Sequence, residues 1–92
     1  MRISDVLRVK GDAQNAITAY NAALKLQPKD PLIYTCRGEA RAAKGDRAGA
    51  LADFDTALKL DAQYANAYYA RGLVRSLIGD VSGAMTDFRQ TV

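Results

Sequence analysis

Three similar ten-residue segments occur in this chain at a constant spacing of 34 residues. They read GDAQNAITAY at 11–20, GDRAGALADF at 45–54 and GDVSGAMTDF at 79–88. Aligned without a gap, residues 31–64 and 65–92 share ten identical pairs over 28 positions, where chance gives about two or three in so Ala-rich a chain. Self-similarity at such a period is the signature of a fold that stacks one small unit. The sequence therefore predicts three copies of one supersecondary element.

The middle unit, residues 31–64, has the pattern of two helices. Pro31 suits the first turn of a helix, where its missing N–H costs nothing. Gly45 is expected to end that helix, because glycine takes the left-handed cap conformation without steric cost. Asp46 follows as the N-cap of a second helix, in which apolar residues recur every three or four positions. Each Gly-Asp pair, including the one at 11–12, is therefore predicted to form the turn of a helical hairpin.

The expected fold is all-α and forms a single domain over residues 1–92. The complete unit at 31–64 lies between partial units at 1–30 and 65–92. Glycines and alanines recur where two antiparallel helices must approach closely, which indicates tightly packed pairs that stack on one another. With 92 residues, of which 49% are hydrophobic, the chain supplies one core of modest stability.

A helix-turn-helix unit of 34 residues with these features resembles the tetratricopeptide repeat (TPR), and the resemblance covers essentially the whole chain. The matching positions are an aromatic residue and a packing glycine in the first helix, the turn glycine, and then a small residue, an aromatic residue and an alanine in the second helix. In this sequence they are Tyr34 and Tyr68, Gly38 and Gly72, Gly11, Gly45 and Gly79, Ala16, Ala50 and Ala84, Tyr20, Phe54 and Phe88, and Ala23 and Ala57. The resemblance implies a right-handed α-solenoid of stacked antiparallel helix pairs.

The TPR family typically holds a peptide or a partner helix in a concave groove lined by the first helices. The resemblance therefore implies a non-catalytic protein-interaction scaffold whose partner is a protein or a peptide. The groove positions expected to contact that partner are held by Thr35, Cys36, Glu39, Asn66, Tyr69, Leu73 and Leu77. The first unit would add Met1, Arg2, Asp5, Arg8 and Val9.

One TPR subclass clamps the C-terminal carboxylate of chaperone tails with Lys, Asn and Arg side chains. The corresponding positions in this chain hold Met1, Asp5, Cys36, Asn66 and Ala70. Only the Asn66 position matches in a useful way, so a carboxylate clamp is not expected.

An apolar stripe in the third unit indicates a different ligand. Tyr69, Leu73 and Leu77 repeat every four residues and should face the groove. Such a stripe suits an amphipathic helix or an extended peptide of another protein. Cover by a C-terminal segment of the same protein or by a neighbouring copy explains the stripe equally well.

Two arginines stand where the family usually has an apolar residue. Arg37 and Arg71 are each followed sixteen residues later by an acid, Asp53 and Asp87, whereas both positions are uncharged in the first unit. This joint loss predicts structural ion pairs, Arg37 with Asp53 and Arg71 with Asp87, across each hairpin. The alternatives are a cross-unit pair of Asp53 with Arg71, or ions that bind a ligand or act in catalysis.

The second helix of the third unit carries Met85 and Phe88 on the face that a following unit would cover, and Val92 continues that face. Solenoids normally need a polar capping element. Either the chain is a fragment of a larger protein, or copies stack end to end or exchange helices. A self-assembling structural unit, a homo-oligomer joined through Met85, Phe88 and Val92, is therefore the alternative function.

Composition argues against several other classes of function. The chain has no His, a single Cys (Cys36) and no phosphate-binding glycine motif, so we expect no catalytic residues, metal ligands or cofactor. Charges of both signs are interspersed around a net charge of +3, which predicts neither a nucleic-acid partner nor a membrane surface. The N-terminal stretch lacks a secretory or membrane-spanning pattern, so the expected location is cytoplasmic.

Overall fold

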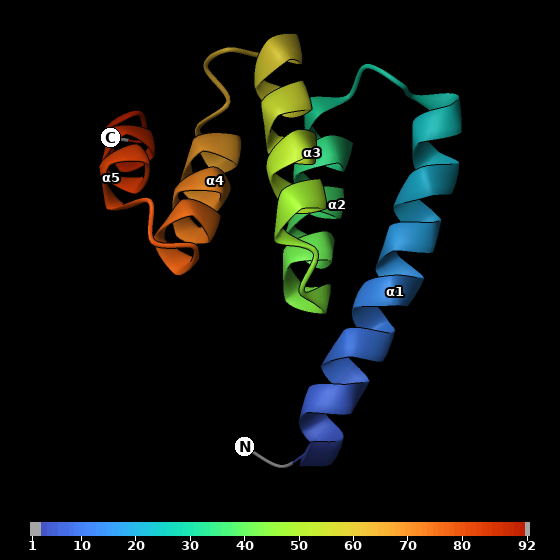
Figure 1. The fold of residues 1–92 in the computed structure, drawn as a ribbon. Helices are drawn as coiled ribbons and strands as arrows, with labels where there is room; N and C mark the ends of the chain where they lie inside the picture. The colour runs from blue at the N-terminus through green and yellow to red at the C-terminus, as the bar shows by residue number, and fades with distance from the viewer. Residues whose placement is uncertain (1–2, 92) are drawn as a thin grey trace.

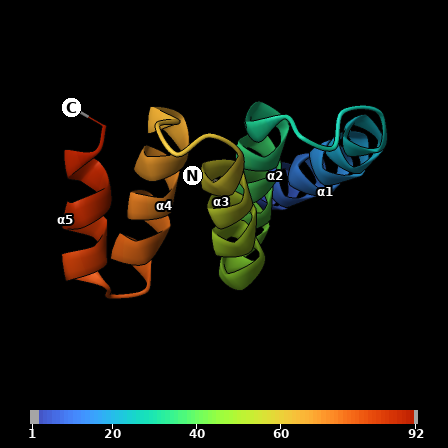
Figure 2. The same ribbon diagram turned by 90° about the horizontal axis from the view of Figure 1, so that it is seen from above.

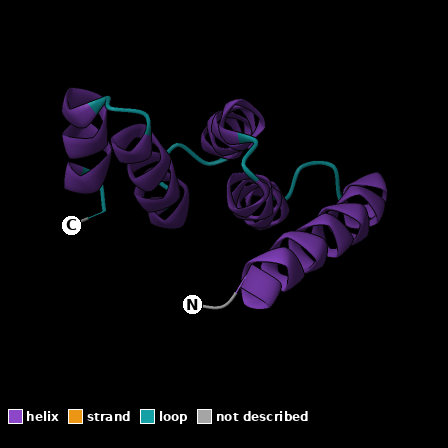
Figure 3. Ribbon diagram, turned by 60° about the horizontal axis from the view of Figure 1, so that its bottom comes forward, coloured by secondary structure: helices purple, strands orange, loops and turns teal. Residues whose placement is uncertain are grey.

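The described part of the protein, residues 3–91 with side chains from residue 12 to residue 91, folds into five α-helices (Figure 1). The structure is a computed structural model. The helices are α1 (Ile3–Leu26), α2 (Pro31–Lys44), α3 (Arg47–Leu60), α4 (Ala65–Leu77) and α5 (Val81–Arg89). Within residues 3–91 no strand is present, which confirms the predicted all-α class (Figure 3).

The helices lie in a row in chain order, from α1 at one end to α5 at the other (Figure 2). Helices α2 and α3 form one hairpin, α4 and α5 form a second, and α3 packs against α4 where the two hairpins meet. Helix α2 also contacts α4, and α1 packs along α2. This arrangement is the predicted solenoid of helix pairs, and it brings α2 and α4 to the same side of the stack.

The Gly-Asp turns of the second and third units have the predicted geometry. Gly45 ends α2 in the left-handed conformation with φ 99°, and the Asp46 carboxylate accepts a hydrogen bond of 2.9 Å from the N–H of Gly49. The third unit repeats both features, with φ 88° at Gly79 and a side-chain cap from Asp80. Glycine is needed at the two turns because other residues are strained at positive φ.

The turn predicted at 11–12 is wrong, because α1 continues as one helix through this Gly-Asp pair. One reason lies three residues after the aspartate, where the other two units have glycine and this unit has Asn15. A methyl group at Gly49 would collide with the capping carboxylate of Asp46, so a side chain at that position obstructs the same cap.

The first unit also lacks the residues that hold the other hairpins closed. Residue 4, Ser4, stands where the other units have their packing glycine, and Ile3 and Ala19 replace the arginine and aspartate of the ion pair. A hairpin at 11–12 would therefore have neither a close helix contact nor a buried charge pair, and an uninterrupted helix avoids the loss of its backbone hydrogen bonds. These differences explain why the same dipeptide forms a turn twice and a helix once.

The best-buried cluster lies between α3 and α4 and consists of Ala50, Phe54, Ala70 and Val74. Phe54 is fully buried, and its ring lies against Gly38 of α2, just as Phe88 lies against Gly72. The small residues predicted to allow close helix approach therefore do so, and the stacked hairpins share one core.

Candidate partner-binding groove

Each hairpin is closed by a two-pronged arginine-aspartate pair. Arg37 donates from Nε to Asp53 Oδ2 at 3.0 Å and from Nη2 to Oδ1 at 2.7 Å. Arg71 bonds Asp87 in the same way, at 3.0 and 2.8 Å. The Asp87 side chain is 1% exposed, so the pair is shielded from water. The structure thus places these four residues inside the hairpins as structural pairs and away from the surface between α2 and α4.

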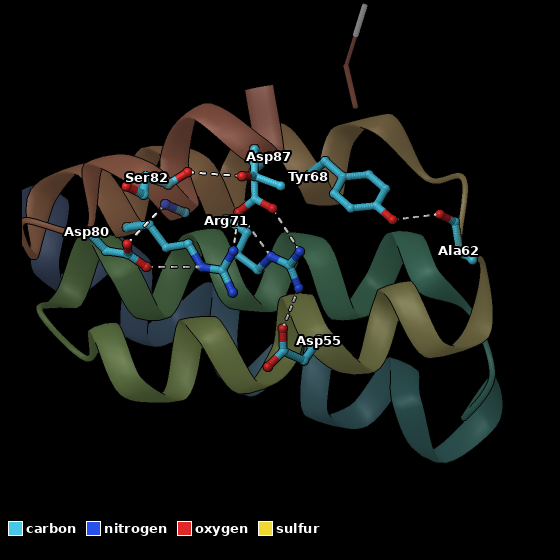
Figure 4. A network of polar contacts seen from close by, with 10 residues as sticks. Asp55, Ala62, Tyr68, Arg71, Asp80, Ser82 and Asp87 are labelled. Atoms are coloured by element: carbon cyan, nitrogen blue, oxygen red, sulfur yellow. Dashed lines mark hydrogen bonds and ion pairs between the residues drawn. The ribbon is translucent and has the colours of Figure 1, made fainter. Parts of the chain in front are cut away.

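Further arginine contacts of this network were missed from the sequence. Arg75 donates to Asp87 at 3.1 Å, as Arg41 does to Asp53. The sequence held a sign of these contacts, because both units have arginine at this position of the repeat. Arg71 also donates from Nη1 to Asp55 of the preceding unit at 2.8 Å (Figure 4). The alternative cross-unit pair of Asp53 with Arg71 is therefore wrong, because the cross-unit partner of Arg71 is Asp55.

These hydrogen bonds set the charge state of the network. The hydrogen bonds to Asp87 raise the pKa of the Arg71 guanidinium, and the hydrogen bonds to Asp53 raise the pKa of the Arg37 guanidinium. Burial acts in the opposite direction but is outweighed. The arginines therefore stay charged, and their positive charge is already neutralised within the hairpins. They are not free to bind an acidic ligand.

A tyrosine positions each arginine and the loop before it. The Arg71 guanidinium lies 5.5 Å from the ring centre of Tyr68, whose hydroxyl donates to the carbonyl of Ala62 at 2.9 Å (Figure 4). Tyr34 makes the equivalent contacts with Arg37 and with the carbonyl of Pro28. The aromatic position of the repeat thus fixes both the ion pair and the connection between units.

An apolar hollow of about 320 Å³ lies between α2 and α4, and the residues of the ion pairs do not line it. Its walls come from both helices, and Phe54 of α3 forms its floor. The lining residues are Glu39, Ala42, Ala43, Phe54, Tyr69, Ala70, Leu73, Val74 and Leu77. The three alanines make room, and the leucines and the tyrosine supply apolar surface. We call this feature the α2–α4 hollow.

The predicted stripe of Tyr69, Leu73 and Leu77 forms one wall of the hollow, and all three side chains are exposed. The Tyr69 ring packs against Phe88 of α5, with ring centres 5.9 Å apart and planes at 50°. This tilted contact holds one end of the stripe in place. The wall is therefore a preformed and exposed apolar surface.

Other residues predicted to line the groove lie elsewhere. Thr35 is wrong as a groove residue, because it is 2% exposed and its hydroxyl donates to the Pro31 carbonyl at 2.8 Å. Cys36 is half-buried beside Tyr20, and Asn66 is exposed but outside the hollow. The remaining positions, Met1, Arg2, Asp5, Arg8 and Val9, fall outside the residues whose side chains are described.

Among the side chains described in residues 12–91, Glu39 is the only charged one that lines the α2–α4 hollow. Although much of its side chain is exposed, partial burial raises the pKa of its carboxyl. Burial also raises the pKa of the Cys36 thiol, with a further rise from the charge of Glu39. The Cys36 thiol is thus kept neutral, and the described lining of the hollow is apolar apart from the carboxyl of Glu39.

Neither a metal site nor a membrane span emerges from the part of the chain that the structure describes. Its His, Cys, Asp and Glu residues form no cluster of three or more that would hold a metal ion. None of its helices is both long enough and apolar enough to cross a bilayer.

The sequence is similar to one family of known proteins. A family model described as TPR repeat matches residues 5–45 and 38–79 of the chain. No curated protein matches the sequence.

Solved structures match the fold over nearly the whole chain. The first TPR of Spaghetti (RPAP3), bound to the HSP90 peptide SRMEEVD, has a TM-score of 0.83 and 24% identity, over 99% of this chain and 79% of that one. The second TPR of the same protein, bound to the same peptide, has a TM-score of 0.81 and 26% identity, over 97% and 87%. The Sgt2 TPR domain from Aspergillus fumigatus has a TM-score of 0.78 and 25% identity, over 95% and 64%.

Proposed function

Because the chain belongs to the tetratricopeptide repeat family, we propose that it is a protein-interaction module that holds an apolar segment of a protein partner in the α2–α4 hollow. The observation that carries this proposal is the wall of Tyr69, Leu73 and Leu77, which exposes three large apolar side chains beside a hollow lined by alanines. Contiguous apolar surface of this kind on a small domain typically marks a binding site. The second Spaghetti (RPAP3) repeat domain, which has the same fold, is bound to a peptide, and this supports the class of partner.

The partner's chemistry should differ from that of SRMEEVD, which carries two glutamates and a terminal aspartate. Among the described side chains, the charge at the hollow is the negative Glu39, and Arg37 and Arg71 are neutralised inside the hairpins. An acidic tail would face repulsion here, whereas a Lys or Arg next to an apolar anchor would be attracted. We therefore propose an apolar segment flanked by a basic residue. No catalytic role is proposed, since the charged pairs have structural partners.

Selected peptides test this function. A display library of random peptides is selected for binding to the full chain. One selected peptide is then labelled, and its affinity for the chain is measured by fluorescence anisotropy. Leu73→Glu should weaken binding at least about tenfold, because it places a charge in the centre of the apolar wall. The matched control is Leu60→Glu, since Leu60 at the end of α3 is 39% exposed, against 44% for Leu73, and does not line the hollow.

Equal binding by the wild type and Leu73→Glu, or selection of no peptide at all, would refute the proposal. The charge of the selected peptides is a separate readout. Selected peptides rich in Asp and Glu would contradict the proposed basic residue beside the apolar segment, but they would not contradict the apolar binding site.

A further inference from the structure

The outer face of α5 is a second surface with no covering element in the described structure. Ser82, Met85, Thr86 and Arg89 line a shallow hollow of about 230 Å³ on this helix, which lies at the end of the row (Figure 2). Met85 is 52% exposed. We call these four residues the α5 outer face.

The repeat itself shows what such a face is built to receive. The residues 34 positions before Met85 and Arg89 are Leu51 and Asp55 of α3, and there the face is covered by α4. Leu51 packs beside the cluster that contains Ala70, and Asp55 accepts the hydrogen bond from Arg71. The α5 outer face therefore corresponds to a surface that elsewhere in the molecule seats a helix with small apolar residues.

The preceding unit repeats this arrangement. Ile17 of α1 occupies the same position as Leu51 and Met85 and is buried, and Asn21 accepts a hydrogen bond of 2.8 Å from Arg37 of α2. At each of the two covered junctions, one arginine of the incoming helix thus meets an acceptor side chain, Asn21 or Asp55. The contact is a constant feature of how this chain stacks its helices.

At the α5 outer face the acceptor is replaced by a cation. Arg89 occupies the position of Asn21 and Asp55, and it forms no ion pair with any side chain described in residues 12–91. An incoming helix with arginine in the position of Arg71 would set two guanidinium groups against each other. Because like charges in direct contact are repelled, the seated helix needs a carboxylate there.

We infer that the α5 outer face docks an amphipathic helix from outside residues 1–92, one that carries Asp or Glu in the position of Arg71 and small apolar residues in the positions of Ala67, Ala70 and Val74. The acid pairs with Arg89, and the small residues pack on Met85 and on the rim of Phe88. This surface is distinct from the α2–α4 hollow and does not depend on the function proposed for it. The charge of Arg89 also excludes a further arginine-bearing unit of this chain's own type in that register.

Two synthetic helices test the inference against the full chain. The first has the sequence of residues 62–78, which includes α4, and the second is identical except for Glu in place of Arg71. Fluorescence anisotropy should show that the wild-type chain binds the Glu peptide about fivefold or more tightly than the Arg peptide. Arg89→Asp should reverse this preference, whereas Leu73→Glu, in the α2–α4 hollow, should leave it unchanged.

A lone helix binds weakly, so a second measurement uses each peptide fused after residue 92 of the chain through a copy of residues 59–61, which connect the equivalent positions in the preceding unit. The tether raises the effective concentration. The Glu fusion should unfold at a higher temperature than the Arg fusion, and Arg89→Asp should invert the order.

Each other outcome overturns the inference. Equal behaviour of the two peptides in both measurements would mean that Arg89 selects nothing. Loss of the preference in Leu73→Glu would place the peptides in the α2–α4 hollow. Dimerisation of the unextended chain by light scattering, abolished by Met85→Glu, would assign the α5 outer face to a second copy of this chain.

Discussion

The ring of Phe54 occupies the space that a side chain on Gly38 would need. A methyl group built on Gly38 would lie 2.5 Å from Cε1 of the ring and 3.1 Å from the Ala50 carbonyl oxygen. We expect Gly38→Ala to lower the free energy of unfolding by about 2 kcal/mol, because overpacking outweighs the gain in helix propensity. Urea unfolding followed by circular dichroism measures this loss.

A size exchange provides the control for this contact. Phe54→Leu alone leaves a cavity at a fully buried site and should also destabilise the protein. The double variant Gly38→Ala/Phe54→Leu should lose about 1 kcal/mol less free energy of unfolding than the sum of the two single losses, since the smaller side chain makes room for the methyl group. Strict additivity of the two losses would show that ring and glycine do not compete for the same space.

Removal of Arg71 should be more costly than removal of any exposed arginine. Arg71→Ala leaves the buried Asp87 with Arg75 alone and also releases Asp55. We expect a loss of about 3 kcal/mol, which lowers the melting temperature by more than about 10 °C. Arg47→Ala removes an exposed arginine near the start of α3 and serves as the control. Similar melting temperatures for the two variants would mean that the network adds nothing to stability.

Replacement by alanine at two glycines of the same motif should change the melting temperature in opposite directions. Gly11 lies inside α1, where glycine costs about 1 kcal/mol relative to alanine, so Gly11→Ala should raise the melting temperature. Gly45 has φ 99°, where a side chain is strained, so Gly45→Ala should lower the melting temperature by a comparable amount. Thermal unfolding of both variants decides the point, and destabilisation by Gly11→Ala would instead indicate a turn at 11–12.

The raised pKa of Glu39 gives stability a defined pH dependence. The folded protein binds the Glu39 proton more tightly than the unfolded chain, in which a glutamate titrates near about 4.3. The resulting stabilisation is present below that pH and is lost as pH rises through the folded pKa. Glu39→Gln should therefore melt above the wild type at neutral pH, with the difference vanishing near about pH 4.

The control for this pH profile is Asp12→Asn, which removes an exposed carboxyl outside the hollow and corrects for net charge. A stability difference between Glu39→Gln and the wild type that does not change with pH would contradict the assignment. The same residue has a second readout, because Glu39→Lys should strengthen binding of the peptide SRMEEVD severalfold.

The sequence predicted the two complete hairpins because several independent features agree in each of them. At 45–46 and 79–80 the turn glycine, the capping aspartate, the packing glycine and the ion pair all recur with the same spacing. The Gly-Asp pair at 11–12 has only the first two features, and it lies within a helix. A turn signal therefore needs its tertiary partners, which a local motif does not reveal.

The candidate site was predicted in part. The stripe at Tyr69, Leu73 and Leu77 follows from helical spacing, and it lines the hollow. The burial of Thr35 was missed because a position in a helix does not show how its neighbours pack. Asp55 was missed for another reason. Residues 21 and 55 both accept a hydrogen bond from the arginine of the following helix, but they are different residues, so a search for identical positions does not find the contact.

Arg71 is bonded at once to Asp87 of its own hairpin and to Asp55 of the preceding one, so separating the two hairpins leaves one charge of this bridge without its partner. In a solenoid, where stability is a sum of unit and neighbour terms, such a bridge makes the coupling between neighbours strong. Residues 31–91 should then unfold cooperatively, as one block. At the junction between α1 and α2 the equivalent acceptor is the neutral Asn21, and a hydrogen bond to a neutral acceptor is weaker than one to a carboxylate. The charged links between neighbouring helix pairs are therefore concentrated at the junction of the two hairpins.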